Sequence, residues 1–172
     1  MSTAVKLTPT SAIVLGFLEL FGEATPYDLK RYAARSVGHF WTFQHAQLYT
    51  ETERLAKAGL LREEREEGGR RRKHYSLTEA GKKALADWRS QPTTELAELR
   101  DLGVLQLFFG ADPPALGAAQ AEAHERKLAE YLDIRARSGD DVPEGPRQAL
   151  ECGIEVERAL IRFWKQLADS GA

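Results

Sequence analysis

Apolar residues recur at helical spacing in three short stretches of the first sixty residues. The first two stretches each follow a Thr-Pro pair, Thr8-Pro9 and Thr25-Pro26, in which the threonine suits an N-cap and the proline suits the first helical position. The third stretch is QHAQLYTETERLAKAG, and its expected inward residues are Leu48, Thr52 and Leu55. The pattern predicts three short helices joined by tight connections.

The hydrophobic period changes after residue 60. The segments LLREEREE and RKHYSLT flank the pair Gly68-Gly69, which predicts a two-stranded hairpin with the glycines at its tip. Thr78 then suits the N-cap of a fourth helix, EAGKKALADWRS, whose apolar face includes Leu85 and Trp88. Three helices, a hairpin and a helix form, in that order, a winged helix-turn-helix domain, which we expect over residues 1–92.

The second half of the chain, residues 93–172, is predicted to be mainly helical. A Leu- and Phe-rich helix is expected near 95–109, a long polar helix over 113–137, and a last helix near 147–168. The last helix spaces apolar residues in steps of three, four and seven, as a coiled-coil seam does. The seam residues, expected at a dimer interface, are Leu150, Ile154, Ile161, Trp164 and Leu167. The predicted fold class is mainly α with a small β-hairpin: a winged helix-turn-helix domain plus a C-terminal α-helical dimerisation module.

Composition excludes several classes of function. The chain has 172 residues and a single cysteine, Cys152, so an internal disulfide and a cysteine-based zinc site are both excluded. The four histidines lack the spacing of a metal motif, and no Walker loop, G-x-S-x-G or Cys-His motif is present, so we expect neither a cofactor nor an enzyme. No stretch is apolar enough to cross a bilayer, and the N-terminal residues lack a signal-peptide core. We therefore expect a cytoplasmic protein with no membrane partner.

Charge is divided unequally between the two halves. Residues 1–92 carry 15 Lys and Arg against 11 Asp and Glu, a net charge of +4, whereas residues 93–172 carry 9 against 15, a net charge of −6. The net charge of −2 for the whole chain hides this division. A basic half joined to an acidic half indicates that the two halves have different partners.

Two sequence blocks resemble the PadR-like family of bacterial transcriptional regulators. They are FWTFQHAQLYTETERLAKAGLL, with Tyr49 and Leu55 followed by AGLL, and GGRRRKHYSLTEAGKKALADW, with YSLTEAG and Trp88. The segment LQLFFG and the two long helices after it are similar to the C-terminal module of one subgroup, so the resemblance covers nearly the whole chain. The sequence departs from the family where Thr50 follows Tyr49, because many members have proline there. The resemblance implies a homodimer that binds a two-fold operator, usually represses transcription, and in several cases releases DNA when a small molecule binds.

The third helix and the hairpin tip carry the residues best suited to contact DNA. The recognition helix of a helix-turn-helix enters the major groove, where Gln pairs with adenine and Arg with guanine. The outward positions of the third helix are Gln44, His45, Gln47, Thr50, Glu51 and Arg54, and Tyr49 suits either a phosphate contact or packing. The cations expected to neutralise phosphates or enter the minor groove from the hairpin tip are Arg70, Arg71, Arg72 and Lys73. Two alternatives stay open: an ordinary solvated face, and surface ion pairs between these cations and Glu66 or Glu67.

Large aromatic residues outside the first three helices indicate either packing or a ligand site. Trp88 and Trp164 fall on apolar helix faces, which suits a core, a dimer interface or the wall of a pocket for an aromatic or amphipathic effector. The resemblance implies a pocket between the fourth helix and the C-terminal module. The effector candidates are therefore Trp88, Phe108 and Tyr131.

These patterns together favour a homodimeric, ligand-responsive repressor that binds a pseudo-palindromic operator in double-stranded DNA. One alternative is a winged-helix protein-interaction module or antirepressor without direct DNA readout. Another is a repressor with no small-molecule effector. The arginines of the hairpin tip distinguish the repressor from the protein-interaction module. Replacing them should weaken DNA binding and flatten the salt dependence of DNA affinity only if the tip contacts DNA.

Overall fold

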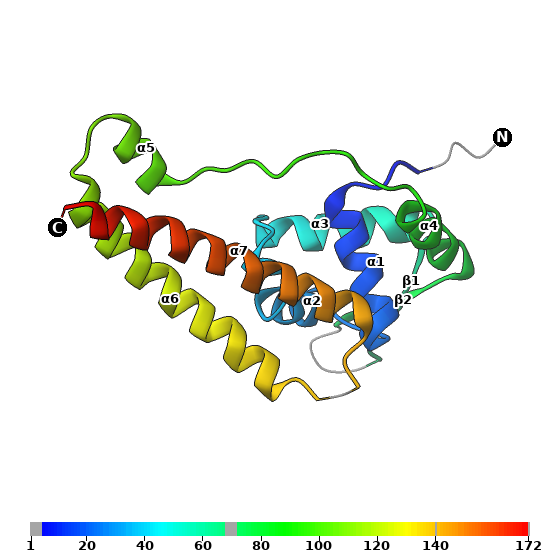
Figure 1. The fold of residues 1–172 in the computed structure, drawn as a ribbon. Coiled ribbons are helices and arrows are strands. Elements are labelled where there is room, and N and C mark those ends of the chain that lie inside the picture. The colour runs from blue at the N-terminus through cyan, green and yellow to red at the C-terminus, as the bar shows by residue number, and fades with distance from the viewer. Residues whose placement is uncertain (1–4, 68–71, 140, 172) are drawn as a thin grey trace. The chain divides into compact units, whose positions relative to one another are not determined.

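A computed structural model of the chain describes residues 5–67, 72–139 and 141–171 (Figure 1). The chain divides into two compact units, Met1–Glu95 and Leu96–Ala172. The elements of the first unit are α1 (Pro9–Phe21), α2 (Pro26–Ala34), the 3-10 helix η1 (Val37–His39), α3 (His45–Lys57), β1 (Leu61–Arg65), β2 (Lys73–Leu77) and α4 (Glu79–Arg89). Those of the second are α5 (Leu102–Phe108), α6 (Pro113–Arg137), α7 (Glu144–Ala168) and the 3-10 helix η2 (Asp169–Gly171). The predicted fold class, mainly α with one small hairpin, is confirmed.

Side-chain caps fix the starts of α1, α2 and α4 where the sequence predicts them. The hydroxyl of Thr8 accepts from the backbone N–H of Ser11 at 3.1 Å, and that of Thr25 accepts from Asp28 at 3.2 Å. The side chains of Ser11 and Asp28 return a bond to the backbone N–H of each threonine, so both helices begin with a complete capping box. Thr78 caps α4. Each cap satisfies N–H groups that a first helical turn leaves without a partner.

Strands β1 and β2 form an antiparallel hairpin, the wing, in a register that pairs Leu61 with Leu77 and Glu63 with Tyr75. An isolated bridge joins the wing to the connection between α1 and α2. In that bridge Ala24 N–H donates to Tyr75 O at 3.0 Å, and Tyr75 N–H donates to Ala24 O at 2.9 Å. Tyr75 is buried, so the centre of β2 is anchored in the domain.

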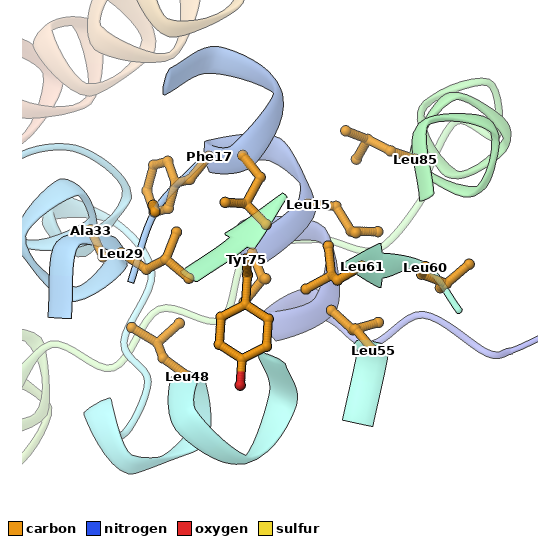
Figure 2. Close-up of a cluster of buried hydrophobic side chains, with 13 residues drawn as sticks. Leu15, Phe17, Leu29, Ala33, Leu48, Leu55, Leu60, Leu61, Tyr75 and Leu85 are labelled. Carbon is orange, nitrogen blue, oxygen red and sulfur yellow. The ribbon is translucent and has the colours of Figure 1, made fainter. Parts of the chain in front are cut away.

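The core of the first unit collects apolar side chains from its helices and both strands (Figure 2). Its members include Leu15 of α1, Leu29 of α2, Leu48 and Leu55 of α3, Leu61 of β1, Tyr75 of β2 and Leu85 of α4. Leu48, Thr52 and Leu55 are completely buried, as the sequence predicts. One face of α3 is therefore fixed on the core, which leaves the opposite face outside.

Helices α6 and α7 of the second unit pack lengthwise and antiparallel (Figure 1). Gly117, near the start of α6, lies against the end of α7, where a Cβ atom would come within 2.6 Å of the Trp164 carbonyl oxygen. Tyr131, later in α6, lies against Gly153 in the first half of α7. Small residues at these two contacts let the helices approach closely.

Two predicted helix boundaries in this half are wrong. Helix α5 begins at Leu102 rather than near residue 95, because Asp101 accepts from the N–H groups of Gly103 at 2.7 Å and Val104 at 3.1 Å and so caps the helix there. Residues 92–101 are not helical. Helix α7 begins at Glu144 rather than near 147, directly after Pro143.

The predicted seam of α7 faces α6 of the same chain. Ile154 and Trp164 have no exposed surface, while Leu150, Ile161 and Leu167 are partly buried. Ile154 and Trp164 therefore have no surface left for a partner chain. They were predicted to lie at a dimer interface, but they pack within the chain instead. Their apolar partner is α6, which the sequence did not identify because its own apolar stripe is sparse.

Candidate nucleic-acid interface

The outer face of α3 carries most of the residues that the sequence singles out for contact with DNA. Gln47, Tyr49 and Thr50 are exposed, and Gln44 is the N-cap residue, with an exposed side chain. The hydroxyl of Thr50 donates to the Gln47 carbonyl at 3.2 Å. The side chain of His45 lies outside the described part of the chain. Polar side chains at the leading end of a helix are the arrangement that a major-groove reader needs.

A cavity of about 550 Å³ opens beside this face, between α2, α3 and the wing. Its lining includes the exposed rings of Tyr27 and Tyr49 and the exposed cations Arg31 and Arg72. The other lining residues are Thr25, Pro26, Asp28 and Lys73. Phenol hydroxyls and guanidinium groups around an open hollow suit phosphate oxygens. Tyr27 is not predicted from the sequence, where its signal is an aromatic residue directly after the Thr25-Pro26 helix start.

Asp28 is the acidic residue among those that line this cavity, and its carboxylate is bound by neighbouring residues of α2 and its N-cap. Its carboxylate accepts from the Thr25 hydroxyl at 2.7 Å and the Thr25 N–H at 3.1 Å, and lies 3.6 Å from an Nη atom of Arg31. The Thr25 hydroxyl bond, with smaller help from the Thr25 N–H and from Arg31, lowers the pKa of Asp28 below its usual value despite partial burial. The carboxylate thus caps α2 and orients Arg31 towards the cavity.

Lys73 and His74 of β2 tie the wing to its neighbours. The Lys73 ammonium group donates to Glu53 of α3 at 2.8 Å and lies 3.5 Å from Glu63 of β1. His74 has one ring nitrogen 3.1 Å from Glu23 and the other 3.1 Å from Glu66. Lys73, predicted to be a free cation for DNA, is therefore a bridge between the wing and α3. Arg72 is exposed, whereas Arg70 and Arg71 lie outside the described residues.

The acidic arm of the wing also has a structural role. Glu63 faces Tyr75 across the hairpin and accepts from its hydroxyl at 3.2 Å and from Arg65 Nε at 3.0 Å. Desolvation opposes ionisation of Glu63, but the bonds from Arg65 and Tyr75 and the charge of Lys73 outweigh it and lower its pKa. Acidic residues on β1 thus hold the basic strand in register.

Glu51 of α3 was expected to face outward, and that prediction is wrong. The residue is only 9% exposed, because its carboxylate packs against the N-terminus of α1. It accepts from Arg54 Nε at 2.9 Å and Nη2 at 2.7 Å, from the Ser11 hydroxyl, and from the Thr8 hydroxyl at 3.5 Å. Arg54 Nη2 also donates to the Ser11 hydroxyl oxygen at 3.0 Å. Arg54, predicted to contact DNA, is therefore engaged within the protein.

These bonds give the stability of the domain a dependence on pH. The Arg54 hydrogen bonds, followed by those from Ser11 and Thr8, lower the pKa of Glu51 against the opposing effect of burial. A lowered carboxyl pKa contributes stability above the pKa of an unfolded glutamate, about 4.3, and this contribution is lost as pH falls through the folded value. Wild type should therefore lose stability between about pH 5 and pH 3 more steeply than Glu51→Gln does. Urea unfolding at a series of pH values, for wild type and for Glu51→Gln, measures this difference.

A second apolar row runs along α7 on the side away from α6. Its members follow one another in steps of three and four, and all are exposed: Ala149, Cys152, Val156, Ala159 and Phe163. Val156 is 50% exposed and Phe163 42%. The sequence contains this spacing, but the larger residues of the row that packs on α6 obscured it.

The three effector candidates differ in their surroundings. Trp88 is 49% exposed on α4, so it is not the core residue that its helix face suggested. Phe108 of α5 is 81% exposed and stacks edge-on against Phe109. Tyr131 is buried against Gly153 within the second unit. Trp88 and Phe108 therefore have ring surface available for a partner, and Tyr131 has little.

Within the ranges that the structure describes, no group of three or more His, Cys, Asp and Glu is placed to hold a metal ion. None of the helices in those ranges has the length and apolar character needed to cross a membrane.

The sequence of the chain is similar to those of known transcriptional regulators. The model of the transcriptional regulator PadR-like family matches residues 14–87. The negative transcriptional regulator PadR of Bacillus subtilis (strain 168) is 34% identical over 100 residues, which are 56% of this chain and 53% of that protein. The alignment thus covers about half the length of this curated relative.

Solved structures extend the likeness of fold to nearly the whole chain. The crystal structure of Bacillus subtilis PadR in complex with operator DNA superposes with a TM-score of 0.80 at 23% identity, covering 92% of this chain and 96% of that one. Bacillus subtilis PadR in complex with p-coumaric acid gives a TM-score of 0.75 at 21% identity, covering 95% and 97%. Residues 14–87, which form the winged helix-turn-helix, match the PadR-like family of transcriptional regulators, and the remaining helices share the fold of the PadR structures.

Proposed function

We propose that the protein is a repressor that binds a pseudo-palindromic operator as a homodimer and releases it in response to a small aromatic or amphipathic molecule. The observation that carries DNA binding is the cavity lined by Tyr27, Arg31, Tyr49 and Arg72 beside the exposed face of α3. It places cations and phenol groups next to the polar leading end of a helix, in the half of the chain with net charge +4. The relative whose structure includes operator DNA has the same fold.

Within this interface we assign base readout to the leading end of α3. Gln44 and Gln47 have the amide geometry to pair bidentately with adenine, and the Thr50 methyl group suits a thymine methyl. His45 belongs to the same end of the helix by sequence. Arg54 and Lys73 are left out of the contact set because both are bound to glutamates of α3.

Phosphate contacts are assigned to the cavity and to the wing. Tyr49, Tyr27 and Arg31 lie on the helices, and Arg72 lies at the start of the arm that leads into β2. Arg70 and Arg71, which precede it in the sequence and lie outside the described residues, extend the same run of cations. Such contacts fix the orientation of a protein on the duplex, while base contacts specify the sequence.

Selection of duplexes from a random DNA library, followed by binding measurements over a range of salt, tests this assignment. Wild type should enrich a sequence with two-fold symmetry. Arg31→Ala and Arg72→Ala should each weaken binding to the selected and to a scrambled duplex alike, and each should reduce the slope of log affinity against log salt by about 1. Lys83→Ala on α4 removes an exposed cation away from the cavity and should leave the slope unchanged.

Two results contradict the assignment. Unchanged salt slopes for Arg31→Ala and Arg72→Ala would exclude the cavity from the DNA-binding surface. Failure of wild type to enrich any sequence would favour the alternative, a winged-helix protein-interaction module or antirepressor.

The homodimer is supported by apolar surface that the single chain leaves uncovered. The exposed row of α7 has the spacing of a coiled-coil seam. Leu96, Phe108 and Phe109 add further exposed apolar area in the same unit. A row of exposed apolar residues along one face of a helix is typical of an interaction site. A two-fold dimer would present two copies of α3 to two half-sites about one helical turn, or a multiple, apart.

Response to an effector rests on the exposed rings of Trp88 and Phe108 and on the relative solved with p-coumaric acid. Adding a panel of small aromatic acids, with p-coumaric acid among them, to the same binding reactions tests it. Release of the selected duplex together with a change in tryptophan fluorescence supports the proposal. Unaltered affinity across the panel leaves a repressor without an effector of this class.

A further inference from the structure

The carboxylate of Glu51 is a buried charge in the middle of α3. A charge removed from water is costly unless it is paired and fully hydrogen-bonded. Here the carboxylate has a bidentate pair with Arg54 and a bond from Ser11, a residue with no exposed surface. Bidentate Arg–carboxylate pairs fix direction as well as distance. The pair holds the two side chains together, and because both Glu51 and Arg54 bond the Ser11 hydroxyl of α1, it also fixes this part of α3 against α1.

The network is continuous with the start of α1. The Ser11 hydroxyl oxygen accepts from the Thr8 N–H at 2.8 Å and from Arg54 Nη2 at 3.0 Å, and its proton goes to Glu51. The Thr8 hydroxyl, which caps α1, also lies 3.5 Å from the same carboxylate. The capping box of α1 and the ion pair of α3 are thus one hydrogen-bonded assembly.

The position of this assembly along α3 connects it to the proposed DNA contacts. Gln47, Glu51 and Arg54 follow one another in steps of four and three, so they lie on one side of the helix. Glu51 is about 6 Å along the axis from Gln47. Because a helix moves as a rigid rod over this length, any rotation of α3 at Glu51 moves the Gln47 amide by a similar angle.

We propose that Glu51, held by Arg54 and Ser11 against the start of α1, is a positioning residue that fixes the rotation of α3 for base readout. The inference rests on the proposed function, because it concerns how well α3 fits a sequence. It gives Arg54 an indirect role in place of a base contact. An apolar contact at the same place would hold the helix on the core but would not fix its rotation in this way.

The test compares binding to the duplex selected by wild type with binding to a scrambled duplex of the same length and composition. Glu51→Gln keeps the shape but replaces the charge that holds Arg54 bidentately. It should weaken binding to the selected duplex by about tenfold, the order of one lost base contact, while affinity for the scrambled duplex and its salt slope stay unchanged. Glu79→Gln, which removes the same charge from an exposed side chain at the start of α4, should leave both affinities unchanged.

A double-mutant cycle separates an indirect role of Arg54 from a direct one. Arg54→Ala should lose about as much preference for the selected duplex as Glu51→Gln, and the double variant should lose no more, because both changes break one assembly. All variants are compared at a temperature at which circular dichroism shows them folded. Should Arg54→Ala not fold, Ser11→Ala removes one bond of the network and should lower the same preference by a smaller factor.

Three outcomes overturn the inference. If Glu51→Gln keeps the wild-type preference for the selected duplex over the scrambled one, the network only stabilises the fold. Arg54→Ala that weakens binding to both duplexes and lowers the salt slope by about 1 shows that Arg54 contacts phosphate directly. Failure of wild type to select any sequence would contradict the proposed function, and the positioning role with it. This result comes from wild type alone, so it is separate from the results for the variants, which test only the positioning role.

Discussion

Glutamates placed at both Val156 and Phe163 are expected to convert the proposed dimer into monomers and to weaken operator binding by a hundredfold or more. Both side chains belong to the exposed row of α7, and two charges there would face two charges of the partner across a desolvated seam. A monomer binds only one half-site, and linkage of two sites is worth about 10²–10⁴ in affinity. Sedimentation equilibrium gives the mass, and binding to the selected duplex gives the affinity.

The matched control is Arg158→Glu. It changes the charge of α7 by the same two units, but on the charged side of the helix, where Arg158 pairs with Glu155 at the surface. We expect this variant to remain dimeric and to bind as wild type does. A Val156→Glu, Phe163→Glu double variant that still has the mass of a dimer would place the interface elsewhere, and the exposed residues of α5 and the segment before it would be the next candidates.

Local signals in the sequence predicted the first unit well. Thr8 and Thr25 each cap a helix whose first residue is proline, and these interactions depend only on residues three positions apart. The buried face of α3 was also predictable, because Leu48, Thr52 and Leu55 follow the helical period. The wing was located from its glycines, although β1 contains several residues with poor strand propensity.

Charged residues are where the sequence was least informative. Polarity and period placed Glu51 among the outward residues, yet its carboxylate is buried because Arg54 and Ser11 satisfy it. Lys73 was grouped with the arginines before it, yet its position opposite Glu53 depends on how the wing packs beside α3. Residues distant in the sequence decide whether a charged side chain is paired within the protein or is available to bind DNA. The periodicity of the sequence does not reveal those distant partners.

The second unit shows the same limit for apolar residues. The pattern of α7 predicts a seam, but a pattern does not say whether the partner helix comes from the same chain or from another. Helix α6 covers the row that contains Ile154 and Trp164, and the weaker row with Val156 and Phe163 stays exposed. The sequence therefore predicted that α7 needs partners on its surface, and only the packing of α6 shows which row is still available.

Gly81, in the first turn of α4, occupies a position with no room for a side chain. A Cβ atom there would lie 2.1 Å from the carbonyl oxygen of Leu60 and 3.2 Å from a methyl group of Leu77. The Leu60 carbonyl is held in place, since it accepts from the N–H of Thr78 at 3.2 Å and from the Thr78 hydroxyl at 3.0 Å. The backbone cannot yield without breaking the cap of α4 and the start of the wing.

Gly81→Ala is therefore expected to destabilise the first unit by about 3 kcal/mol, the upper part of the range for single substitutions. Gly16→Ala is the matched control, because a Cβ at that position in α1 meets no atom within 4 Å. There the lost flexibility of the unfolded chain should leave stability unchanged or raise it by up to about 1 kcal/mol. Urea unfolding followed by circular dichroism measures both. Equal stability of the two variants would mean that α4 can move away from Leu60 at little cost, so the junction between the wing and α4 would be adaptable rather than fixed.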